Sequence, residues 1–416
     1  MKLSLQPFKL LLASVVIGPF LGLCYSYFSQ RTLIGLQADE ELLLHFGAYV
    51  AILLLFLVKL QSSIRINTTI LDNSDLAKII NRLLIAICCI TIIIFFFAGS
   101  KILSGESNRG SIRVELGLLA PIYAFSLKYA LPTIAFVIAI CMYLTARIRP
   151  SRASGYKSKL NIALGLIVFC AFMSGAKFTL VMVCLPLVCF YWAAFNWSAK
   201  TLLVVSALAF MVGSHIIFQS SDFSLMSSIN YIYARATRIA AYGVLGCWEY
   251  VSTRDFDTLP AIMNGILGRR LGELALSFLD PVASSIFADP HRLITVMYYP
   301  SYDRAVEGTT GLTLTLFGEL VLHLRLFWFV GFVFFLGWFS VVLRFTSDCL
   351  ETGKLLLGIT GFIYMIMVLL PVLNSGLVFK MISLPFFIHM LGVTILIKFL
   401  LGKNKSNRKM QISDDR

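Results

Sequence analysis

Ten apolar runs dominate the sequence, each close to the length needed to cross the hydrocarbon core of a bilayer. A spanning helix needs about 20 predominantly apolar residues in succession. The runs cover approximately residues 10–28, 42–58, 83–99, 129–146, 160–174, 178–195, 201–219, 326–343, 355–373 and 381–399. Segments 112–126 and 312–322 are apolar enough to form re-entrant or interfacial helices, which would raise the number to eleven or twelve. We therefore expect an all-α polytopic membrane protein, a single integral membrane domain over residues 1–416 with about 10 (10–12) transmembrane helices.

The composition excludes a soluble multidomain enzyme. Hydrophobic residues make up 58% of the chain and charged residues 13%, against about 45–50% and about 25% in soluble globular proteins. The nine cysteines are scattered and form no CxxC pair, which argues against a zinc site or a disulfide framework. No acidic cluster has the spacing of a cation cage, so we expect neither a bound metal nor a cofactor. Nucleic-acid binding has no motif behind it.

Two strongly basic segments predict the orientation in the membrane. Segment 147–159 carries five cations and no acid, and further cations follow in the tail 402–416. Cytoplasmic loops of membrane proteins carry an excess of Lys and Arg, so both segments are expected in the cytoplasm. Ten spans satisfy both assignments and place both termini on the cytoplasmic side. Loops 100–128 and 220–311 then lie on the opposite, outer face.

The charges on the two faces differ in kind as well as in number. The predicted cytoplasmic side holds 20 Lys and Arg against 6 acids, which accounts for the whole net charge of +14. The opposite side is balanced at 15 cations and 15 acids, and 11 of those cations are Arg. Between Ser220 and Gly311 there are seven Arg and no Lys. Orientation needs only positive charge, whereas the planar guanidinium binds phosphate oxygens in bidentate fashion. The Arg bias therefore favours an anion-binding function.

The 92-residue outer loop is too long for a simple connection and has helical patterns of its own. Segments 229–251 and 266–282 carry apolar residues at helical spacing and should form amphipathic helices at the outer interface. Their aromatic side chains suited to the headgroup region are Tyr231, Tyr233, Tyr242 and Trp248. We expect this loop to fold with loop 100–128 over a membrane-facing cavity that holds an anionic, phosphate-containing, lipid-linked substrate. The basic candidates for that role are Arg109, Arg113, Arg235, Arg238, Arg269 and Arg270. A purely structural role, in contact with lipid phosphate or with nearby acids, stays open for each Arg.

Candidate acid–base groups are few. His291, in the DPHR segment of the long loop, could act as general base on a sugar hydroxyl, although a lone His is more often structural. Glu319 lies near membrane depth and is a functional candidate, but it could equally pair with Arg325. Lys177 lies in a tight outer turn and could reach into the cavity or snorkel to the interface. Rival carboxylates to His291 are Glu273, Asp280, Asp289, Asp303 and Glu307. The histidines that we interpret as packing or interface residues are His45, His215, His323 and His389.

Three stretches resemble one family of bacterial membrane proteins. The SGAK at 174–177 is similar to a small-Gly-basic signature at the start of a mid-chain span, with Lys177 in place of the usual Arg. The RGSIR at 109–113 resembles an Arg-bearing first large loop. The stretch EGTTGLTLTLFGELVLHLRLFWFVGFVFFLG at 307–337 resembles the segment that leads from the long loop into a Gly-punctuated span. Together with the many spans, these features resemble the Wzy-type O-antigen and capsule repeat-unit polymerases.

The resemblance implies a metal-independent glycosyltransferase of lipopolysaccharide biosynthesis in the bacterial inner membrane. Such an enzyme transfers the growing glycan from undecaprenyl pyrophosphate to a new lipid-linked repeat unit on the periplasmic face. Besides its lipid-linked substrates and membrane lipid, the implied protein partner is a chain-length regulator. The site residues implied are Arg109, Arg113, Arg235 and Arg238 on the pyrophosphate, Lys177, Arg269 and Arg270 as further substrate contacts, and His291, Glu273 or Glu319 for the proton. Two alternatives stay open, an O-antigen ligase that transfers glycan to lipid A core and a polysaccharide flippase or transporter.

Overall fold

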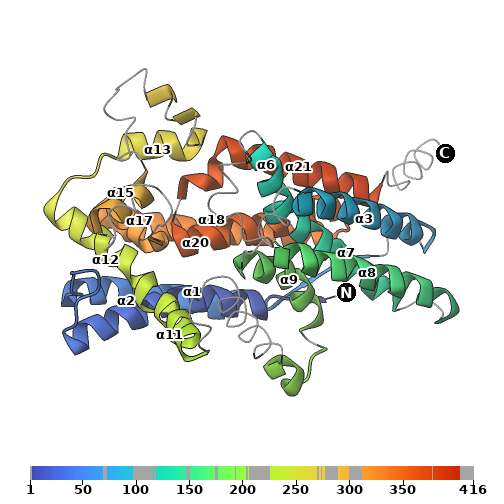
Figure 1. The fold of residues 1–416 in the computed structure, drawn as a ribbon, viewed down its shortest axis with the longest axis horizontal. Helices are drawn as coiled ribbons and strands as arrows, with labels where there is room; N and C mark the ends of the chain where they lie inside the picture. The colour runs from blue at the N-terminus through green and yellow to red at the C-terminus, as the bar shows by residue number, and fades with distance from the viewer. Residues whose placement is uncertain are drawn as a thin grey trace.

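The computed structural model describes residues 2–68, 73–96, 116, 119–146, 150–173, 177–192, 194–202, 205, 225–268, 271–272, 274–276, 289–298, 312–376 and 378–402. These residues are almost entirely helical, and the helices run mostly along the long axis of the molecule (Figure 1). The elements are β1 (Lys2–Ser4), α1 (Gln6–Ser29), α2 (Glu40–Lys59), β2 (Ser63–Arg65), α3 (Asn73–Ile94), α6 (Ala120–Phe125), η3 (Ser126–Ala130), α7 (Leu131–Thr145), α8 (Pro150–Met173), α9 (Lys177–Tyr191), α11 (Leu225–Ala236), α12 (Arg238–Thr253), α13 (Thr258–Leu267), α15 (Pro290–Tyr298), α17 (Thr315–Leu324), η5 (Arg325–Phe327), α18 (Trp328–Glu351), α19 (Leu355–Tyr364), η6 (Met365–Leu369), α20 (Leu370–Ser375), η7 (Val378–Ile382) and α21 (Leu384–Leu401).

Seven helical stretches among the described residues are long and apolar enough to span a membrane. They are Gln6–Ser29, Glu40–Lys59, Asp75–Ile94, Ala120–Thr145, Thr315–Glu351, Leu355–Ser375 and Leu384–Leu401. The prediction of an all-α polytopic membrane protein is confirmed, while the number of about ten spans stays a prediction. Two of the remaining expected runs form α8 and α9, which pack against α7. Most of the last one, 201–219, lies outside the described residues.

Two of these stretches form the centre of the bundle. Ala120–Thr145 and Leu355–Ser375 are each 72% buried inside the protein, whereas the other five are 28–39% buried. The outer helices instead expose large apolar side chains such as Val58 and Phe334. In water such faces would be unfavourable, but lipid tails solvate them as well as a protein core does. This distribution is that of a bundle surrounded by hydrocarbon.

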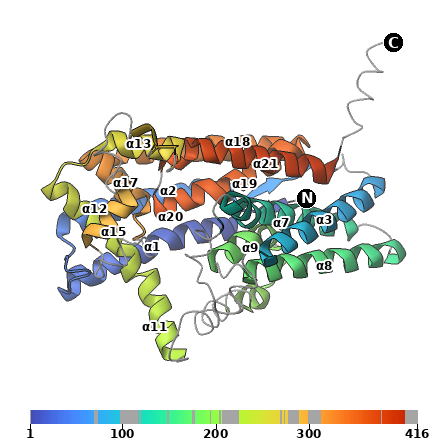
Figure 2. The same cartoon turned by 45° about the horizontal axis from the view of Figure 1, so that its top comes forward.

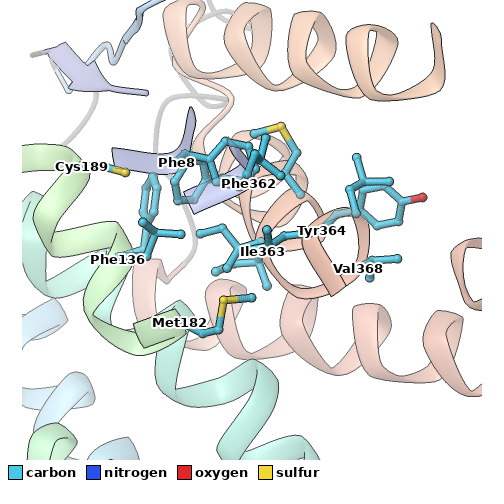
Figure 3. Packing of buried hydrophobic residues seen from close by; sticks show 14 of the residues in the cluster. Phe8, Phe136, Met182, Cys189, Phe362, Ile363, Tyr364 and Val368 are labelled. Carbon is cyan, nitrogen blue, oxygen red and sulfur yellow. The ribbon is translucent and has the colours of Figure 1, made fainter. Parts of the chain in front are cut away.

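The central packing joins helices that are distant in the sequence. Figure 3 shows Phe8 of α1, Phe136 of α7 and Phe362 of α19 in one cluster with side chains of α9. The ring centroids of Phe136 and Phe362 are 4.8 Å apart. Met182 and Val368 lie in the same region of this core, and both also line the cavity described below. The inner wall of that cavity is therefore part of the rigid centre of the bundle.

Each central stretch contains a π-helical turn. The turn η3 joins α6 to α7, and the turn η6 joins α19 to α20. A π-helical turn inserts an extra residue into the helix, and such turns occur frequently at functional sites. Nothing in the apolar pattern of residues 120–145 or 355–375 had indicated them.

The N-terminal helices form a hairpin closed by a short sheet. Strands β1 and β2 pair antiparallel with Leu3 opposite Ile64, and both side chains are fully buried. Asp39 caps the start of α2, since its carboxylate accepts a hydrogen bond from the backbone N–H of Leu42 at 2.7 Å. Helix α12 packs on α1, and the approach at Gly22 is so close that a Cβ there would lie 2.5 Å from the carbonyl oxygen of Thr237. Only glycine fits at this position without a shift of the backbone. The two strands were not expected from the sequence.

The helices of the long loop differ from their predicted bounds. Segment 229–251 forms two helices, α11 and α12, divided at Thr237, whose φ of −111° and ψ of −74° depart from the values of a regular α-helix. Helix α12 is not only interfacial, since it packs against both α1 and α17. Helix α11 projects from the side of the molecule (Figure 2). The predicted helix over 266–282 is interrupted at Gly268, the described residues 271–272 and 274–276 are helical again, and 277–282 lie outside the described residues. Helix α13 ends at Leu267, because Gly268 adopts a φ of +82°.

The expected short helix at 312–322 is α17, and it is separated from α18 by a sharp bend. Arg325 has a φ of +52°, which ends α17, and η5 leads into α18. The rings of Phe317 and Trp328 are eleven positions apart in sequence, yet their centroids are only 5.2 Å apart. A straight α-helix would separate them by about 16 Å at 1.5 Å per residue. Helix α17 is thus a separate, largely buried element between α12, α18 and α20.

Candidate functional site

A cavity of about 700 Å³ connects the helices of the long loop with the centre of the bundle. Helices α13, α15 and α17, which gather at one end of the molecule (Figure 1), line what we call the polar end. We call the part lined by η3, α9, η6 and α21 the bundle end. The polar end contains Asn264, Asp289, His291 and Glu319. The bundle end contains Leu127, Lys128, Tyr129, Met182, Met367, Val368, Phe386 and His389.

His291 lies at the start of α15 with a defined ring orientation. Asp289 accepts a hydrogen bond from the backbone N–H of His291 at 3.0 Å and so caps the helix. The ring Nδ1 of His291 is 3.2 Å from the carbonyl oxygen of Leu312. A carbonyl oxygen only accepts hydrogen bonds, so in the neutral ring Nδ1 carries the proton and Nε2 is the basic nitrogen. Of the carboxylates that rivalled His291 in sequence, Asp289 lines the cavity with it.

Residues on both sides of the 299–311 segment hold His291 in place. The hydroxyl of Thr295 donates to the carbonyl of His291, and the backbone N–H of Leu312 donates to the same hydroxyl at 2.8 Å. Thr295 is 1% exposed, so these bonds are shielded from water. The backbone just before α17 therefore supports both the ring and the main chain of His291.

Glu319 is a buried carboxylate in the wall of the same cavity. It is 1% exposed, and its Oε2 accepts a hydrogen bond from the backbone N–H of Val378 at 2.9 Å. Its Oε1 lies 3.8 Å from Nε2 of His323. The alternative pairing with Arg325 is not formed, because Arg325 makes its ion pair with Asp255. Glu319 thus ties α17 to η7, the element that carries Phe379 into the cavity wall.

The surroundings of Glu319 are apolar and aromatic. The ring of His323 lies between Phe256 and Phe379, with centroid distances of 5.2 and 5.3 Å, which fits its interpretation as a packing residue. Burial, together with the negative charge of Glu319, raises the pKa of the Cys247 thiol well above its ordinary value. The Cys247 thiol near Glu319 is therefore neutral at physiological pH.

Gly376 permits the close approach of Glu319 to η7. A Cβ on residue 376 would lie 2.6 Å from Oε2 of Glu319, and the φ of +76° is one that L side chains rarely adopt. Gly376→Ala should therefore destabilise the protein by about 1–3 kcal/mol, which thermal unfolding in detergent will measure. The matched control is Gly337→Ala in α18, where a Cβ has open space among the described residues. An equal midpoint for the two variants would contradict this account.

At the bundle end, three aromatic side chains form a parallel group. The rings of Tyr129 and His389 have centroids 4.8 Å apart and planes inclined by 17°. Phe125 is similarly parallel to both rings, at about 6 Å from each. Nδ1 of His389 bonds to the carbonyl oxygen of Pro385. His389 was interpreted from sequence as a packing residue, and Lys128 and Tyr129 were not singled out, because no motif marks residues on a π-helical turn.

Of the remaining predicted site residues, Arg238 is the one whose side chain the structure describes. Arg238 lies in α12 with its guanidinium over the ring of Tyr25, 4.5 Å from the centroid, and is not among the cavity-lining residues. Lys177 begins α9 and Arg235 lies in the last turn of α11, but their side chains are not described. Six residues singled out from the sequence lie outside the described residues, namely Arg109, Arg113, Arg269, Arg270, Glu273 and His215. The same holds for the rival carboxylates Asp280, Asp303 and Glu307.

Comparison with known proteins gives no relative. No family model, no curated protein and no solved structure matches this chain. Among the described residues, no group of three or more His, Cys, Asp or Glu side chains could hold a metal ion. What the described arrangement offers is proton transfer by an oriented imidazole, in a cavity that two carboxylates also line and that continues into an apolar bundle.

Proposed function

We propose that this protein is a membrane-embedded glycosyltransferase that polymerises lipid-linked oligosaccharide repeat units, the class of enzyme that its sequence resembles. One observation carries the proposal. His291 and Glu319, both candidates from the sequence, line the same cavity, and a backbone carbonyl orients the ring of His291 so that Nε2 is the basic nitrogen. A cavity of about 700 Å³ is also within the range of about 300–1,000 Å³ usual for ligand sites.

In the proposed reaction, Nε2 of His291 accepts the proton of a sugar hydroxyl on the new lipid-linked repeat. The hydroxyl oxygen then forms a bond to the anomeric carbon of the growing glycan. The bond between that carbon and the lipid pyrophosphate breaks, and the pyrophosphate leaves with the bonding electron pair. The proton on His291 is afterwards released to solvent. Fixed guanidinium groups of the outer loops would stabilise the charge that develops on the leaving pyrophosphate.

Glu319 is proposed to act by position rather than by proton transfer. Both of its carboxylate oxygens have a neighbour within the protein, since Oε2 accepts from Val378 N–H and Oε1 faces His323. Its removal would release η7, which supplies Phe379 to the cavity wall. Glu319 would then hold the cavity in shape for the reacting sugars.

The proposed setting is the inner membrane of a bacterium, with both termini in the cytoplasm and the cavity near the periplasmic face. The charge pattern supports this orientation, because the whole net charge of +14 falls on the side assigned to the cytoplasm. Undecaprenyl-pyrophosphate-linked repeats would enter from the membrane, and a chain-length regulator would be the protein partner.

An O-antigen ligase is the second candidate. This alternative is favoured by His291, since ligases with this architecture have a His near the end of the long outer loop. The chemistry at the cavity would be the same, and only the acceptor would change from a lipid-linked repeat to lipid A core. A flippase or transporter is less well supported, because ionisable side chains within the spans are few.

Deleting the gene and separating the surface polysaccharide on a gel distinguishes the candidates. Loss of a repeat-unit polymerase should leave lipid A core with a single repeat. Loss of a ligase should leave bare core while long lipid-linked chains accumulate. Loss of a flippase should leave repeats that never reach the outer face. A normal ladder of chain lengths would contradict all three.

A further inference from the structure

The small sheet β1–β2 carries a second hollow in the protein surface, separate from the cavity described above. This surface hollow has a volume of about 480 Å³ and is lined by Lys2, Arg65, Ile66, Asn67 and Glu351. Lys2 and Arg65 are exposed, whereas the neighbouring strand residues Leu3 and Ile64 are fully buried. Since side chains alternate between the two faces of a strand, one face of the sheet packs into the core and the other borders the hollow.

The surface hollow lies where three spans end. Strand β1 leads directly into α1, β2 follows α2, and Glu351 is the last residue of α18. The backbone N–H of Asn67 donates to the carbonyl oxygen of Leu350 at 2.9 Å, which ties the segment after β2 to the end of α18. Because all three helices are long and apolar enough to span a membrane, the hollow lies at the level of the lipid headgroups. At the other end of α2, Asp39 accepts a hydrogen bond from Trp248 of α12, so the hollow and this long-loop helix are on opposite faces.

Lys2 and Arg65 face each other across the sheet. They are partners in the antiparallel register, so both side chains leave the sheet on the same face, with Cβ atoms about 5 Å apart. Like charges in this position destabilise a strand pair. Among the described residues, neither side chain forms an ion pair or a hydrogen bond. Glu351, the carboxylate that lines the hollow, instead accepts a hydrogen bond from the hydroxyl of Ser347 at 3.4 Å.

Membrane orientation alone does not account for two opposed cations. Positive charge anywhere near the ends of the spans orients a membrane protein, and placing two cations opposite each other only lowers stability. The nearby Lys9 has a structural contact, since its Nζ donates to the carbonyl oxygen of Leu60 at 2.5 Å. Lys2 and Arg65 make no such contact within the part of the chain that the structure describes, so their donors are left for a group outside the protein.

The charge and the location of the surface hollow together indicate the class of ligand. Two cations and one carboxylate line it, which gives a net charge of +1. A phosphodiester carries one negative charge, and its two free oxygens match the planar fork of an Arg guanidinium. Such groups are concentrated in the headgroup layer. Leu10 and Val58, on the turns of α1 and α2 close to the sheet, are 58% and 80% exposed, so acyl chains have an apolar surface beside the hollow.

We propose that Lys2 and Arg65 bind the phosphodiester of an anionic bilayer phospholipid of the phosphatidylglycerol type. The guanidinium of Arg65 donates to both free phosphate oxygens, the ammonium of Lys2 donates a further hydrogen bond, and Glu351 accepts from a hydroxyl of the glycerol headgroup. The bound lipid neutralises the two opposed cations and so stabilises the pairing of β1 with β2. It takes no part in the proposed transfer reaction.

Thermal unfolding with and without lipid tests the proposal. The full-length protein is purified in lipid-free detergent, and its unfolding midpoint is measured before and after addition of phosphatidylglycerol. The lipid should raise the midpoint of the wild type. Lys2→Gln and Arg65→Gln should unfold at or above the wild-type midpoint without lipid, because each removes the repulsion, and the lipid should no longer raise it. A lower midpoint without lipid would mean that the cation has a stabilising contact within the protein and would overturn the proposal.

Lipid binding measured by native mass spectrometry examines the same site directly. Lys2→Gln and Arg65→Gln should each weaken binding of phosphatidylglycerol at least about tenfold, the effect of losing a hydrogen bond to a charged group. The matched control is Lys59→Gln, which removes a cation from the last turn of α2 but not from the surface hollow. This control should bind nearly as the wild type does. Equal weakening by all three variants would indicate a diffuse attraction of charges and would overturn the assignment to the hollow.

Other ligands distinguish the headgroup and the source of the phosphate. Phosphatidylethanolamine, which has no net charge, should bind more weakly than phosphatidylglycerol, and equal binding would overturn the assignment to an anionic lipid. Inorganic phosphate should not raise the unfolding midpoint, because it lacks acyl chains, and a rise equal to that with lipid would overturn the assignment to a phospholipid. Arg65→Lys keeps the charge but loses the planar fork, so it should bind more tightly than Arg65→Gln and more weakly than the wild type. Wild-type affinity in Arg65→Lys would overturn the bidentate contact.

Discussion

Replacing His291 by asparagine should slow glycan extension at least about a hundredfold, the usual lower bound for loss of a positioned general base. Asparagine removes the basic Nε2, while its side-chain amide can still donate to the carbonyl of Leu312 that Nδ1 of His291 contacts. The fold should therefore be retained. The measurement is the length distribution of polysaccharide in cells, followed by extension of a lipid-linked repeat by the purified variant.

The matched control for this experiment is His45→Asn. His45 accepts a hydrogen bond from the indole N–H of Trp328 at 3.1 Å and is not among the residues that line the cavity. Its replacement tests what the loss of a partly buried imidazole does in general. If His291→Asn extended glycans at the wild-type rate, His291 would have no part in the reaction.

Replacing Glu319 by alanine should both destabilise the protein and abolish extension. The substitution removes the acceptor of the Val378 N–H, and a buried donor left without a partner costs about 1–3 kcal/mol. Freed from α17, the segment that carries Phe379 would no longer form its part of the cavity wall. The unfolding midpoint in detergent and the polysaccharide ladder measure the two effects.

Glu319→Gln separates position from charge. The amide oxygen of glutamine can accept from Val378 N–H as the carboxylate does, so this variant should unfold near the wild-type midpoint and extend glycans. A stable but inactive Glu319→Gln protein would mean that the negative charge itself acts on the substrate. Glu319 would then belong with His291 among the groups that transfer protons.

The membrane architecture was predictable because lipid imposes a simple rule on the sequence. A span must be apolar along its whole length, so runs such as 42–58 and 355–373 identify α2 and α19–α20 within a few residues. Helix ends inside the long loop were less predictable. There the bounds depend on the local backbone conformation, such as the positive φ of Gly268 and the φ of −111° at Thr237.

Residues of the candidate site were predictable only where a reactive side chain occurs at a location that is unusual for it. His291 and Glu319 were recognised because an imidazole in an outer loop and a carboxylate near membrane depth are unusual there. Lys128 and His389 also lie within apolar spans, and that signal could have identified them. Their meeting could not be foreseen, since it depends on the π-helical turn η3 and on its packing against α21.

The strand pair β1–β2 bears on how the protein is assembled as it is synthesised. Residues 2–65 contain α1, α2 and both strands, so the backbone pairing of β1 and β2 lies entirely within this segment. The contacts of α1 with α12 and of Tyr49 in α2 with Phe317 in α17 are made with elements that come more than 170 positions later. The N-terminal segment thus pairs its own backbone locally, and we expect its final packing to form only after the helices of the second half of the chain have been inserted.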